Sequence, residues 1–345
     1  MDQIYLVLTE TCNLACNHCI RESSPHIKNS INYGELISLL CDIERRYPQA
    51  TVLLTGGEPT VYKYFSEVLS FALDKGLEVL VNTNAVTGFF KESKLARFVK
   101  YKKLRFQISL DGAEEPHNKI RGEGTFAKSL DSLHLLTSMG FKCSVSATVQ
   151  NSDFISNFPV FFESLSELDL THIAIKRATY AGRAASGYEL TSTQWNDFVY
   201  SVRGSITNHK MLIYPMYDFS ELDRISADDL SSFADTNIKY RNCGAGTARV
   251  YVYPNLDVCS CTCFKSKPIG SLSTGSLSSI INSYSPLSVE SSVCSSCRYL
   301  NLCNGGCLGS GYQYFGKINF PDPRCPKIIA SNEGGENSNS LILKI

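Results

Sequence analysis

The sequence predicts an α/β fold, in which a partial (β/α)6 barrel is followed by a small cysteine-rich module. Three observations predict this fold. Six short apolar runs alternate with amphipathic helical runs, polar motifs follow the ends of those runs, and nine of the 14 cysteines lie between residues 243 and 325. The chain has 345 residues, 43% apolar and 19% charged, so it is long enough to bury a sizeable core.

The apolar runs are the predicted strands. In chain order they are IYLVLTE (4–10), TVLLTGG (51–57), LEVLVNTNA (77–85), LRFQISLDG (104–112), KCSVSATVQ (142–150) and HIAIKRAT (172–179). A helical pattern follows each strand. GELISLLCDIERRY places Leu36, Leu39, Leu40 and Ile43 on one face, and TFAKSLDSLHLLTSMG closes with Gly140. Such repeated units imply a parallel sheet with right-handed crossovers, whose ligands gather at the carboxyl ends of the strands.

We expect four segments along the chain. The barrel occupies 1–210 and closes with a helix around Trp195, a bridging segment follows over 211–242, and the cysteine-rich module covers 243–330. This module is too small for an ample core of its own, so bound metal is expected to hold it together. The polar tail over 331–345 is expected to be mobile.

Charge balance and the N-terminus limit the expected partners. The 33 basic and 33 acidic residues cancel, so no overall positive field attracts phosphates and we expect no nucleic-acid partner. The N-terminus lacks the pattern of a signal peptide, and no apolar run has the length of a membrane span. We therefore expect a cytoplasmic protein without a membrane partner.

Three cysteines follow the first strand in CNLACNHC, at Cys12, Cys16 and Cys19. Disulfides are disfavoured in a long chain without an export signal, so metal or cluster ligation is favoured. Three thiolates can hold three irons of a [4Fe-4S] cluster, and the fourth iron then stays open. Zinc is the alternative, but a structural zinc site closes with a fourth Cys or His, and the nearby His18 lies inside the loop.

CNLACNHC resembles the signature of the radical S-adenosylmethionine (SAM) enzymes. The resemblance implies that Cys12, Cys16 and Cys19 hold a cluster whose open iron is chelated by the amino and carboxylate groups of SAM. An electron from such a cluster breaks the sulfonium and gives a 5'-deoxyadenosyl radical. His18 takes the place where an aromatic residue usually meets the adenine.

Other residues match this family in order along the predicted barrel. The resemblance implies SAM contacts for GGEP, Ser109, Asp111 and Arg121, and Arg121 suits a carboxylate by its fork of donors. GGEP comprises Gly56, Gly57, Glu58 and Pro59, and its glycines allow a close backbone approach to a ligand. Asn84, Lys176 and Arg177 are predicted at the same rim, where solvated or structural roles stay open.

A second group of cysteines fills the C-terminal module. It comprises Cys243, Cys259, Cys261, Cys263, Cys294, Cys297, Cys303, Cys307 and Cys325. Paired zinc sites are the alternative, which the lack of accompanying histidines disfavours. The C-x2-C-x5-C-x3-C-x17-C run resembles the SPASM module of radical SAM maturases, which carries two auxiliary [4Fe-4S] clusters and would bring the total to three.

The resemblance assigns these cysteines to two clusters. Its outer cluster is held by Cys294, Cys297, Cys303 and Cys325, and its inner cluster by Cys243, Cys261 and Cys307. The chain departs from the family in two places, because Leu256 occupies a usual glycine position and GAGTARV lacks a cysteine. The inner cluster therefore takes Cys259 or Cys263 as its fourth ligand, or keeps an open iron.

The resemblance covers about Ile4 to Lys327 and implies a radical SAM/SPASM maturase that abstracts hydrogen from a ribosomally made peptide. The expected product is a carbon–carbon or thioether crosslink, or an epimerised residue. Expected partners are the peptide and a reductant such as flavodoxin or ferredoxin. Because strand one leaves no room for a leader-binding domain in front, a separate protein or the SPASM surface would bind the leader, or the substrate has no leader. Thr262 follows Cys261 where the sulfatase-maturing branch has an acid, which disfavours that branch.

Two points stay open. Epimerisation needs a hydrogen-atom donor, for which Cys143 or a spare thiol of CSCTC is a candidate, although an isolated cysteine is often a core residue. The substrate could instead be a small molecule, such as a tetrapyrrole, sugar or cofactor precursor. A non-catalytic iron-sulfur electron carrier or peptide-binding scaffold is the remaining alternative, and GGEP, Ser109 and Arg121 argue against it because neither needs a SAM-binding rim.

Overall fold

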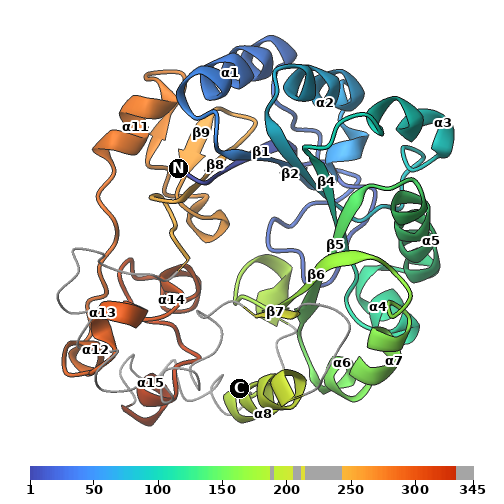
Figure 1. Ribbon diagram of the computed structural model, residues 1–345. Helices are drawn as coiled ribbons and strands as arrows, with labels where there is room; N and C mark the ends of the chain where they lie inside the picture. The colour runs from blue at the N-terminus through green and yellow to red at the C-terminus, as the bar shows by residue number, and fades with distance from the viewer. Residues whose placement is uncertain (187–189, 205–210, 214–242, 332–345) are drawn as a thin grey trace.

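The structure is a computed structural model that describes residues 1–186, 190–204, 211–213 and 243–331. Within these ranges a ten-stranded sheet runs in the order β10-β9-β8-β1-β2-β3-β4-β5-β6-β7 and curves around the centre of Figure 1. The strands are β1 (Gln3–Thr9), β2 (Thr51–Gly56), β3 (Glu78–Thr83), β4 (Leu104–Ser109), β5 (Lys142–Val149), β6 (Leu170–Arg177), β7 (Met211–Ile213), β8 (Arg249–Val252), β9 (Asp257–Cys259) and β10 (Gly270–Ser271).

Strands β1 to β6 are the six predicted strands, and each pairs in parallel with the next. Helices cover the outer side of this arc (Figure 1). The barrel helices are α1 (Tyr33–Arg46), α2 (Phe65–Asp74), α3 (Glu92–Leu95), α4 (Glu114–Arg121), α5 (Thr125–Ser138), α6 (Ser152–Ser156), α7 (Phe158–Glu163) and α8 (Ser192–Gly204). The predicted α/β fold with a partial barrel is confirmed.

Helix α1 shows why these elements form where the pattern predicts them. The Asn32 side chain accepts hydrogen bonds from the backbone N–H groups of Gly34 and Glu35, at 2.8 and 3.2 Å, and so caps the helix. The predicted apolar face is buried against the sheet, with Leu36, Leu39, Leu40 and Ile43 at 0–6% exposure. The N-terminal cap and the burial of the apolar face therefore both stabilise α1 where the sequence pattern predicts it.

Four strands extend the sheet beyond the six predicted ones, and two of these, β7 and β8, pair with strands of the barrel. The short β7, within the segment predicted to be a bridge, pairs in parallel with β6. Strand β8 comes from the predicted cysteine-rich module and pairs in parallel with β1, with Gln3 opposite Arg249. The sheet therefore continues from the barrel into the C-terminal part of the chain.

A tight turn between β8 and β9 explains one departure from the family pattern. Leu256 has a φ of 68° in this turn, where a glycine would adopt the left-handed conformation without strain. The turn is closed by hydrogen bonds from the N–H of Leu256 to the carbonyl of Tyr253 and from the N–H of Tyr253 to the carbonyl of Asp257, both 2.9 Å. Leu256 therefore adopts, at the usual glycine position, the left-handed backbone conformation that favours glycine.

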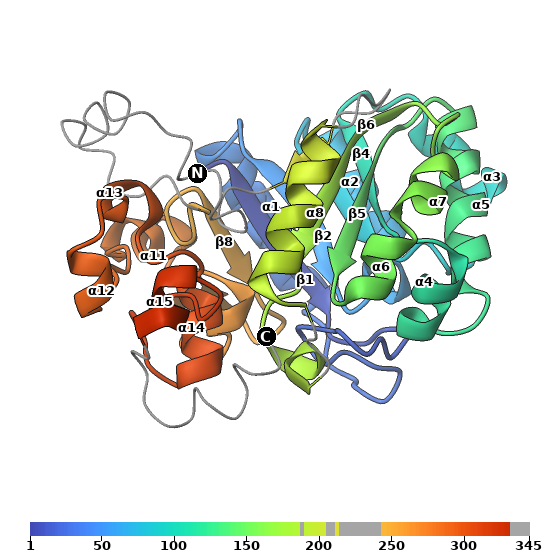
Figure 2. The same ribbon diagram turned by 90° about the horizontal axis from the view of Figure 1, so that it is seen from below.

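The remaining helices form a separate group on one side of the molecule in both Figure 1 and Figure 2. They are α11 (Leu277–Ser283), α12 (Ser292–Ser295), α13 (Leu300–Cys303), α14 (Leu308–Phe315) and α15 (Pro326–Ser331). Most of the predicted bridging segment (214–242) and the predicted mobile tail from 332 onward lie outside the described residues. The predicted domain boundaries stay predictions.

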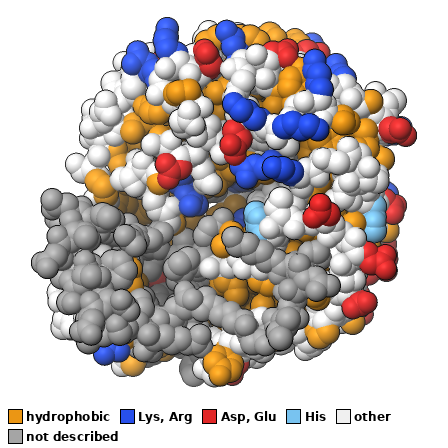
Figure 3. Space-filling model, viewed as in Figure 1, with side chains coloured by type: hydrophobic (Ala, Val, Ile, Leu, Met, Phe, Trp, Pro, Cys, Tyr) orange, Lys and Arg blue, Asp and Glu red, His pale blue; other side chains and the backbone are white. Residues whose placement is uncertain are grey.

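Two surface properties complete the description. Within the described ranges, no helix combines the length and apolar character that a membrane span needs. On the face drawn in Figure 3, Lys and Arg side chains are interspersed with Asp and Glu side chains. This mixture agrees with the balanced formal charge of the whole chain.

A buried arginine connects the C-terminal module to the barrel. Arg324 donates two hydrogen bonds to the Asp322 carboxylate, at 2.8 and 2.7 Å, and a third at 2.8 Å to the carbonyl of Ala178, just after β6. Both side chains are nearly inaccessible, at 2% and 0% exposure. The carboxylate also accepts from the backbone N–H of Cys307 at 3.2 Å.

Replacement of this arginine tests the connection. Arg324→Met should lower the free energy of unfolding by about 3–5 kcal/mol, because the Asp322 carboxylate would stay buried without its partner. The control Lys119→Met removes a surface ion pair with Asp153 and should cause a much smaller decrease. The measurement is the urea midpoint under anaerobic conditions, and equal midpoints for the two variants would contradict a connecting role for Arg324.

Candidate functional site

A cavity of about 520 Å³ lies inside the arc of parallel strands and reaches the ends at which β1 to β6 finish. Figure 2 shows the loop between β1 and α1 at this edge of the sheet. Nine of the residues predicted to hold the cluster or SAM line the cavity: Cys12, Cys16, His18, Cys19, Gly56, Gly57, Asn84, Ser109 and Arg121. Lys176 and Arg177, predicted at the same rim, line it as well.

The cysteine loop is fixed through its backbone. The N–H of Asn17 donates to the carbonyl of Ile120 in α4 at 3.0 Å. Arg183 donates to the carbonyls of Cys16 and Ser23, both at 2.8 Å. These contacts hold the loop that carries the three thiols against α4 and against the segment that follows β6.

Arg183 is a site residue that sequence reasoning did not single out. It lies in the short 3-10 helix Gly182–Ser186, which follows β6, and a Cβ on Gly182 would meet the carbonyl oxygen of Cys19 at 2.5 Å. The available signal was the YAGRA sequence, which places a glycine and an arginine at the end of the sixth strand, where ligands are expected.

Gly56 and Gly57 have a rationale that differs from the predicted one. A Cβ on Gly56 would meet the carbonyl oxygen of Thr9 at 2.3 Å, and one on Gly57 would meet that of Thr11 at the same distance. The N–H of Gly57 donates to the carbonyl of Thr9 at 2.8 Å. The glycines therefore allow the end of β2 to approach the backbone that leads into Cys12. Both glycines also line the cavity.

Glu58 is fully buried and holds the ends of two strands together. Its carboxylate accepts from Thr60, from the Thr83 hydroxyl at 2.7 Å and from the N–H of Asn84 at 2.8 Å. Burial raises the pKa of Glu58, whereas these hydrogen bonds lower it. Pro59 begins the short 3-10 helix that follows. Neither residue lines the cavity, so both position their neighbours.

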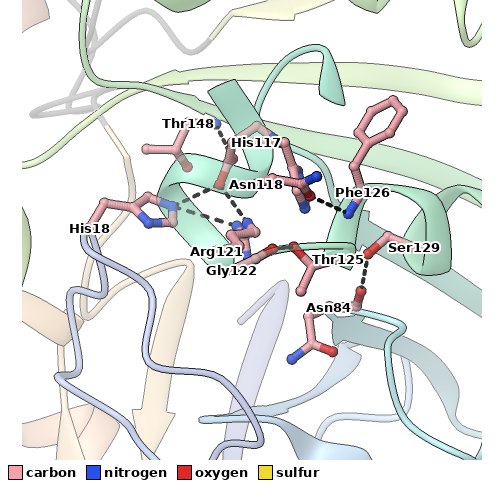
Figure 4. A network of polar contacts seen from close by, with 11 residues as sticks. His18, Asn84, His117, Asn118, Arg121, Gly122, Thr125, Phe126, Ser129 and Thr148 are labelled. Atoms are coloured by element: carbon pink, nitrogen blue, oxygen red, sulfur yellow. Dashed lines mark hydrogen bonds and ion pairs between the residues drawn. The ribbon is translucent and has the colours of Figure 1, made fainter. Parts of the chain in front are cut away.

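Asn84 links β3 to the cysteine loop. Its side-chain amide donates to the Asn13 side chain at 2.9 Å and lies 3.8 Å from the sulfur of Cys12. The backbone carbonyl of Asn84 accepts a hydrogen bond from the Ser129 hydroxyl of α5 at 2.7 Å, a contact drawn in Figure 4. Ser109, at the end of β4, is partly buried and faces the same cavity.

A buried carboxylate organises the other side of the cavity (Figure 4). Asp111, at 0% exposure, accepts from Arg121 at 2.6 Å and from the N–H of Thr148 at 2.8 Å, and its carboxylate lies 2.9 Å from Nε2 of His18. Burial raises the pKa of Asp111, but the charges of Arg121 and His18 outweigh it and lower that pKa overall. Asp111 does not line the cavity, whereas Arg121 and His18 do.

His117 supports this arrangement from behind. Its Nδ1 accepts a hydrogen bond from the N–H of Asp111 at 3.0 Å. Desolvation, followed by the nearby charge of Arg121, lowers the pKa of His117 to about 4. The neutral imidazole thus remains an acceptor at neutral pH and fixes the backbone that carries Asp111.

Four C-terminal cysteines surround a second cavity, of about 90 Å³. They are Cys294, Cys297, Cys303 and Cys325, the set that the resemblance assigns to the outer cluster. Burial raises the pKa of Cys303 to about 12, and the neighbouring Cys325 and Cys294 contribute to that rise. The structure therefore brings this set together, although helices α12, α13 and α15 and their flanks supply its members.

The inner group lines the large cavity instead. Its members are Cys243, Cys261, Cys263 and Cys307. A hydrogen bond from Cys263 lowers the pKa of Cys261 to about 7, and the Cys307 thiol interacts electrostatically with Cys261 and Cys243. A Cβ on Gly309 would meet the Cys263 sulfur at 3.2 Å and the Cys261 sulfur at 3.6 Å, so this glycine leaves room beside both thiols.

Two cysteines of the prediction lie elsewhere. Cys259, on β9, is fully buried against Val7 and Tyr253 and does not line the large cavity. Cys143 lies near the beginning of β5, at the strand end opposite the cysteine loop, and is fully buried in the main core. Burial raises the pKa of Cys143 to about 12. The structure does not bring Cys143 to the site, and its position is that of a core residue.

The three cysteine groups suit clusters better than single ions. Among residues 1–186, 190–204, 211–213 and 243–331, no three Cys, His, Asp or Glu side chains converge closely enough to hold one metal ion. Zinc would require that, since its bonds are about 2.0–2.3 Å long. Thiols that surround a cavity fit a larger group, and all-thiol donor sets are typical of iron-sulfur clusters.

Comparison with known proteins finds a family match over most of the barrel. A model of the radical SAM superfamily matches residues 6–163. The chain is 27% identical to a mycofactocin maturase from Mycolicibacterium smegmatis, over 92% of this chain and 81% of that protein. It is 30% identical to an Fe-coproporphyrin III synthase from Methanosarcina barkeri, but that match covers only 52% of this chain and 44% of the relative, so it spans less than half of that protein.

The fold is shared with solved structures. Streptococcus suis SuiB bound to S-adenosylmethionine aligns with a TM-score of 0.75 at 16% identity, over 94% of this chain and 77% of SuiB. SuiB bound to its precursor peptide SuiA aligns with a TM-score of 0.73, over 94% and 75%. The cysteine motif, the barrel and these matches agree along most of the chain. Residues 6–163 therefore match the radical SAM superfamily, and most of the chain shares its fold with SuiB.

Proposed function

We propose that this radical SAM enzyme modifies a ribosomally made peptide by abstracting a hydrogen atom from one of its residues. The observation that carries the proposal is the continuity of the 520 Å³ cavity, which the cysteine loop and the inner cysteine group line together. A peptide segment in this cavity would face both groups. The similarity to a mycofactocin maturase and the fold shared with SuiB, which was solved with a precursor peptide, support a peptide as the substrate.

In this proposal Cys12, Cys16 and Cys19 hold the first cluster. When bound, that cluster and SAM supply the reductive cleavage that yields a 5'-deoxyadenosyl radical. Arg121 presents its guanidinium to the SAM carboxylate, and Ser109 faces the ribose. Asp111 and Glu58 act as positioning residues, because both are buried behind the cavity wall and bound by protein groups.

The C-terminal cysteines hold two auxiliary clusters in this proposal. The outer one takes Cys294, Cys297, Cys303 and Cys325, and the inner one takes Cys243, Cys261, Cys263 and Cys307. The choice of Cys263 over Cys259 as the fourth inner ligand rests on the cavity, which Cys263 lines and Cys259 does not. These clusters carry away the second electron of a net oxidation or contact the substrate.

The distribution of thiols favours a crosslink over epimerisation. The cysteines among the described residues that line the large cavity are Cys12, Cys16, Cys19, Cys243, Cys261, Cys263 and Cys307. All of them are assigned to clusters, so the described lining offers no spare thiol as a hydrogen-atom donor. A carbon–carbon or thioether crosslink needs no such donor.

The proposal includes partners and a location. A low-potential electron must reach the first cluster, so we propose a reductant such as flavodoxin or ferredoxin. A separate protein could present the leader of the peptide. Both partners imply action in the cytoplasm.

The first test concerns SAM cleavage. Anaerobically reconstituted wild type, given SAM and dithionite, should produce 5'-deoxyadenosine, and Cys16→Ala should produce no more than an enzyme-free control because a ligand of the first cluster is lost. Cys41→Ala, in helix α1, serves as the matched control and should keep the wild-type yield. Chromatography of the nucleoside is the readout, and a wild type that binds zinc and never cleaves SAM would refute the proposal.

A second test concerns the inner cluster. We expect about twelve iron atoms per reconstituted chain, as three [4Fe-4S] clusters require. Cys263→Ala should lower the iron content or change the electron paramagnetic resonance signal of the reduced protein, whereas Cys259→Ala should do neither. The assignment fails if Cys259→Ala loses iron and Cys263→Ala does not.

A third test identifies the product. Co-expression with a short peptide encoded beside this gene, followed by mass spectrometry, should show the loss of two hydrogen atoms, as a crosslink predicts. An unchanged mass with incorporated solvent deuterium would indicate epimerisation instead. If no neighbouring peptide changes, a small-molecule substrate gains support, which would agree with the partial similarity to the Fe-coproporphyrin III synthase.

A further inference from the structure

Apart from the cysteines, the charged side chains that line the large cavity are basic. Its described lining contains six Lys and Arg side chains and no Asp or Glu: Arg21, Arg105, Arg121, Lys176, Arg177 and Arg249. The chain as a whole carries equal numbers of basic and acidic residues. A cavity with such an excess of positive charge favours anionic ligands.

Most of these cations already have partners. Arg105 pairs with Glu78, and Arg121 pairs with Asp111 at 2.6 Å. Arg177 donates to the carbonyl of Leu190 at 3.0 Å.

The two remaining arginines lie near groups that the proposed clusters would occupy. Arg21 donates to the Thr262 hydroxyl at 3.2 Å, beside Cys261. Arg249 interacts electrostatically with Cys243 and Cys261. The negative charge of thiolates would balance both guanidinium groups.

Lys176 differs from all five arginines. It lies near the end of β6, opposite Thr148 of β5, and both residues line the cavity. Its ammonium group has no hydrogen bond or ion pair with any residue that the structure describes. Its electrostatic neighbours are Arg249 and Arg21, which repel it, and Asp111, which is already bound to Arg121 and His18; no cysteine is among them.

The surroundings of Lys176 therefore disfavour a charged ammonium group unless an anionic ligand binds beside it. Burial, followed by repulsion from Arg249, lowers the pKa of Lys176 to about 8. A partly buried ammonium beside two guanidinium groups is destabilising by itself, and a carboxylate within hydrogen-bond distance would offset that cost. In the proposed function the carboxylate of SAM already has a partner, Arg121.

We infer that Lys176 binds a carboxylate of the substrate, and that the peptide segment which enters the cavity carries an Asp or Glu side chain or a free C-terminus. This inference rests on the proposed function, because it concerns the substrate of the same cavity. It makes Lys176 a residue that determines specificity. The predicted acidic group would lie between the cysteine loop and the inner cysteine group, where the hydrogen atom is abstracted.

The test uses a synthetic library in which each hexapeptide with Glu or Asp is paired with its Gln or Asn isostere, and each free C-terminus with its amide. Reconstituted, SAM-bound enzyme is mixed with the library, and retained peptides are quantified by mass spectrometry. Wild type should retain carboxylate members about tenfold better than their isosteres, as a hydrogen bond between charged groups predicts. Lys176→Met should lose this preference, and Lys176→Arg should restore part of it.

Arg105→Gln is the matched control, because it removes a cavity cation that already has a partner in Glu78, and it should keep the preference. Uncoupled formation of 5'-deoxyadenosine without peptide should be the same in wild type and Lys176→Met. If Lys176→Met loses SAM binding, the carboxylate belongs to SAM and the inference fails. Equal retention of carboxylate and amide members also overturns it but leaves the peptide proposal intact, whereas a SAM-cleaving wild type that retains no peptide contradicts both.

Discussion

The site depends on the buried carboxylate of Asp111. This group follows β4 and binds Arg121 at the end of α4, His18 in the cysteine loop and the backbone of Thr148 in β5. A buried carboxylate without partners would be strongly destabilising, so each of these elements is held where its donor reaches Asp111. The cysteine loop, one helix and two strands are thereby fixed relative to one another through a single side chain, and the guanidinium of Arg121 faces the cavity in a defined orientation.

Glu58 applies the same principle on the other side of the cavity, where it joins the ends of β2 and β3. Both acids lie behind the cavity wall, and the described wall itself presents cations. The buried acidic side chains therefore hold the structural elements together, whereas the basic side chains line the cavity, where a ligand can contact them. This division explains how a chain of zero formal charge maintains a cavity whose described lining has basic but no acidic side chains.

Much of the fold follows from the sequence, because the six strands and helices such as α1 carry strong periodic patterns. The short strands β7 and β8 were not predicted, since three or four residues carry too little pattern and their position depends on pairing with β6 and β1. The N-terminal motif and the family resemblance grouped two sets of cysteines, and each set lines one cavity in the structure. The sequence left Cys259 and Cys263 equivalent by spacing, and only tertiary packing separates them, because Cys263 lines the large cavity and Cys259 does not. The role of Glu58 was hidden for a similar reason, as its four donors come from residues 60, 83 and 84.

The pairing of β8 with β1 has a consequence for the order of events during synthesis. The first strand leaves the ribosome early, yet its second neighbour, Arg249–Val252, is made only after two thirds of the chain. Until then β1 is the open edge of a growing sheet, and the cysteine loop that follows it is complete but uncovered on that side. During this interval the free edge of β1 is available for incorrect strand pairing, and the late arrival of β8 covers it.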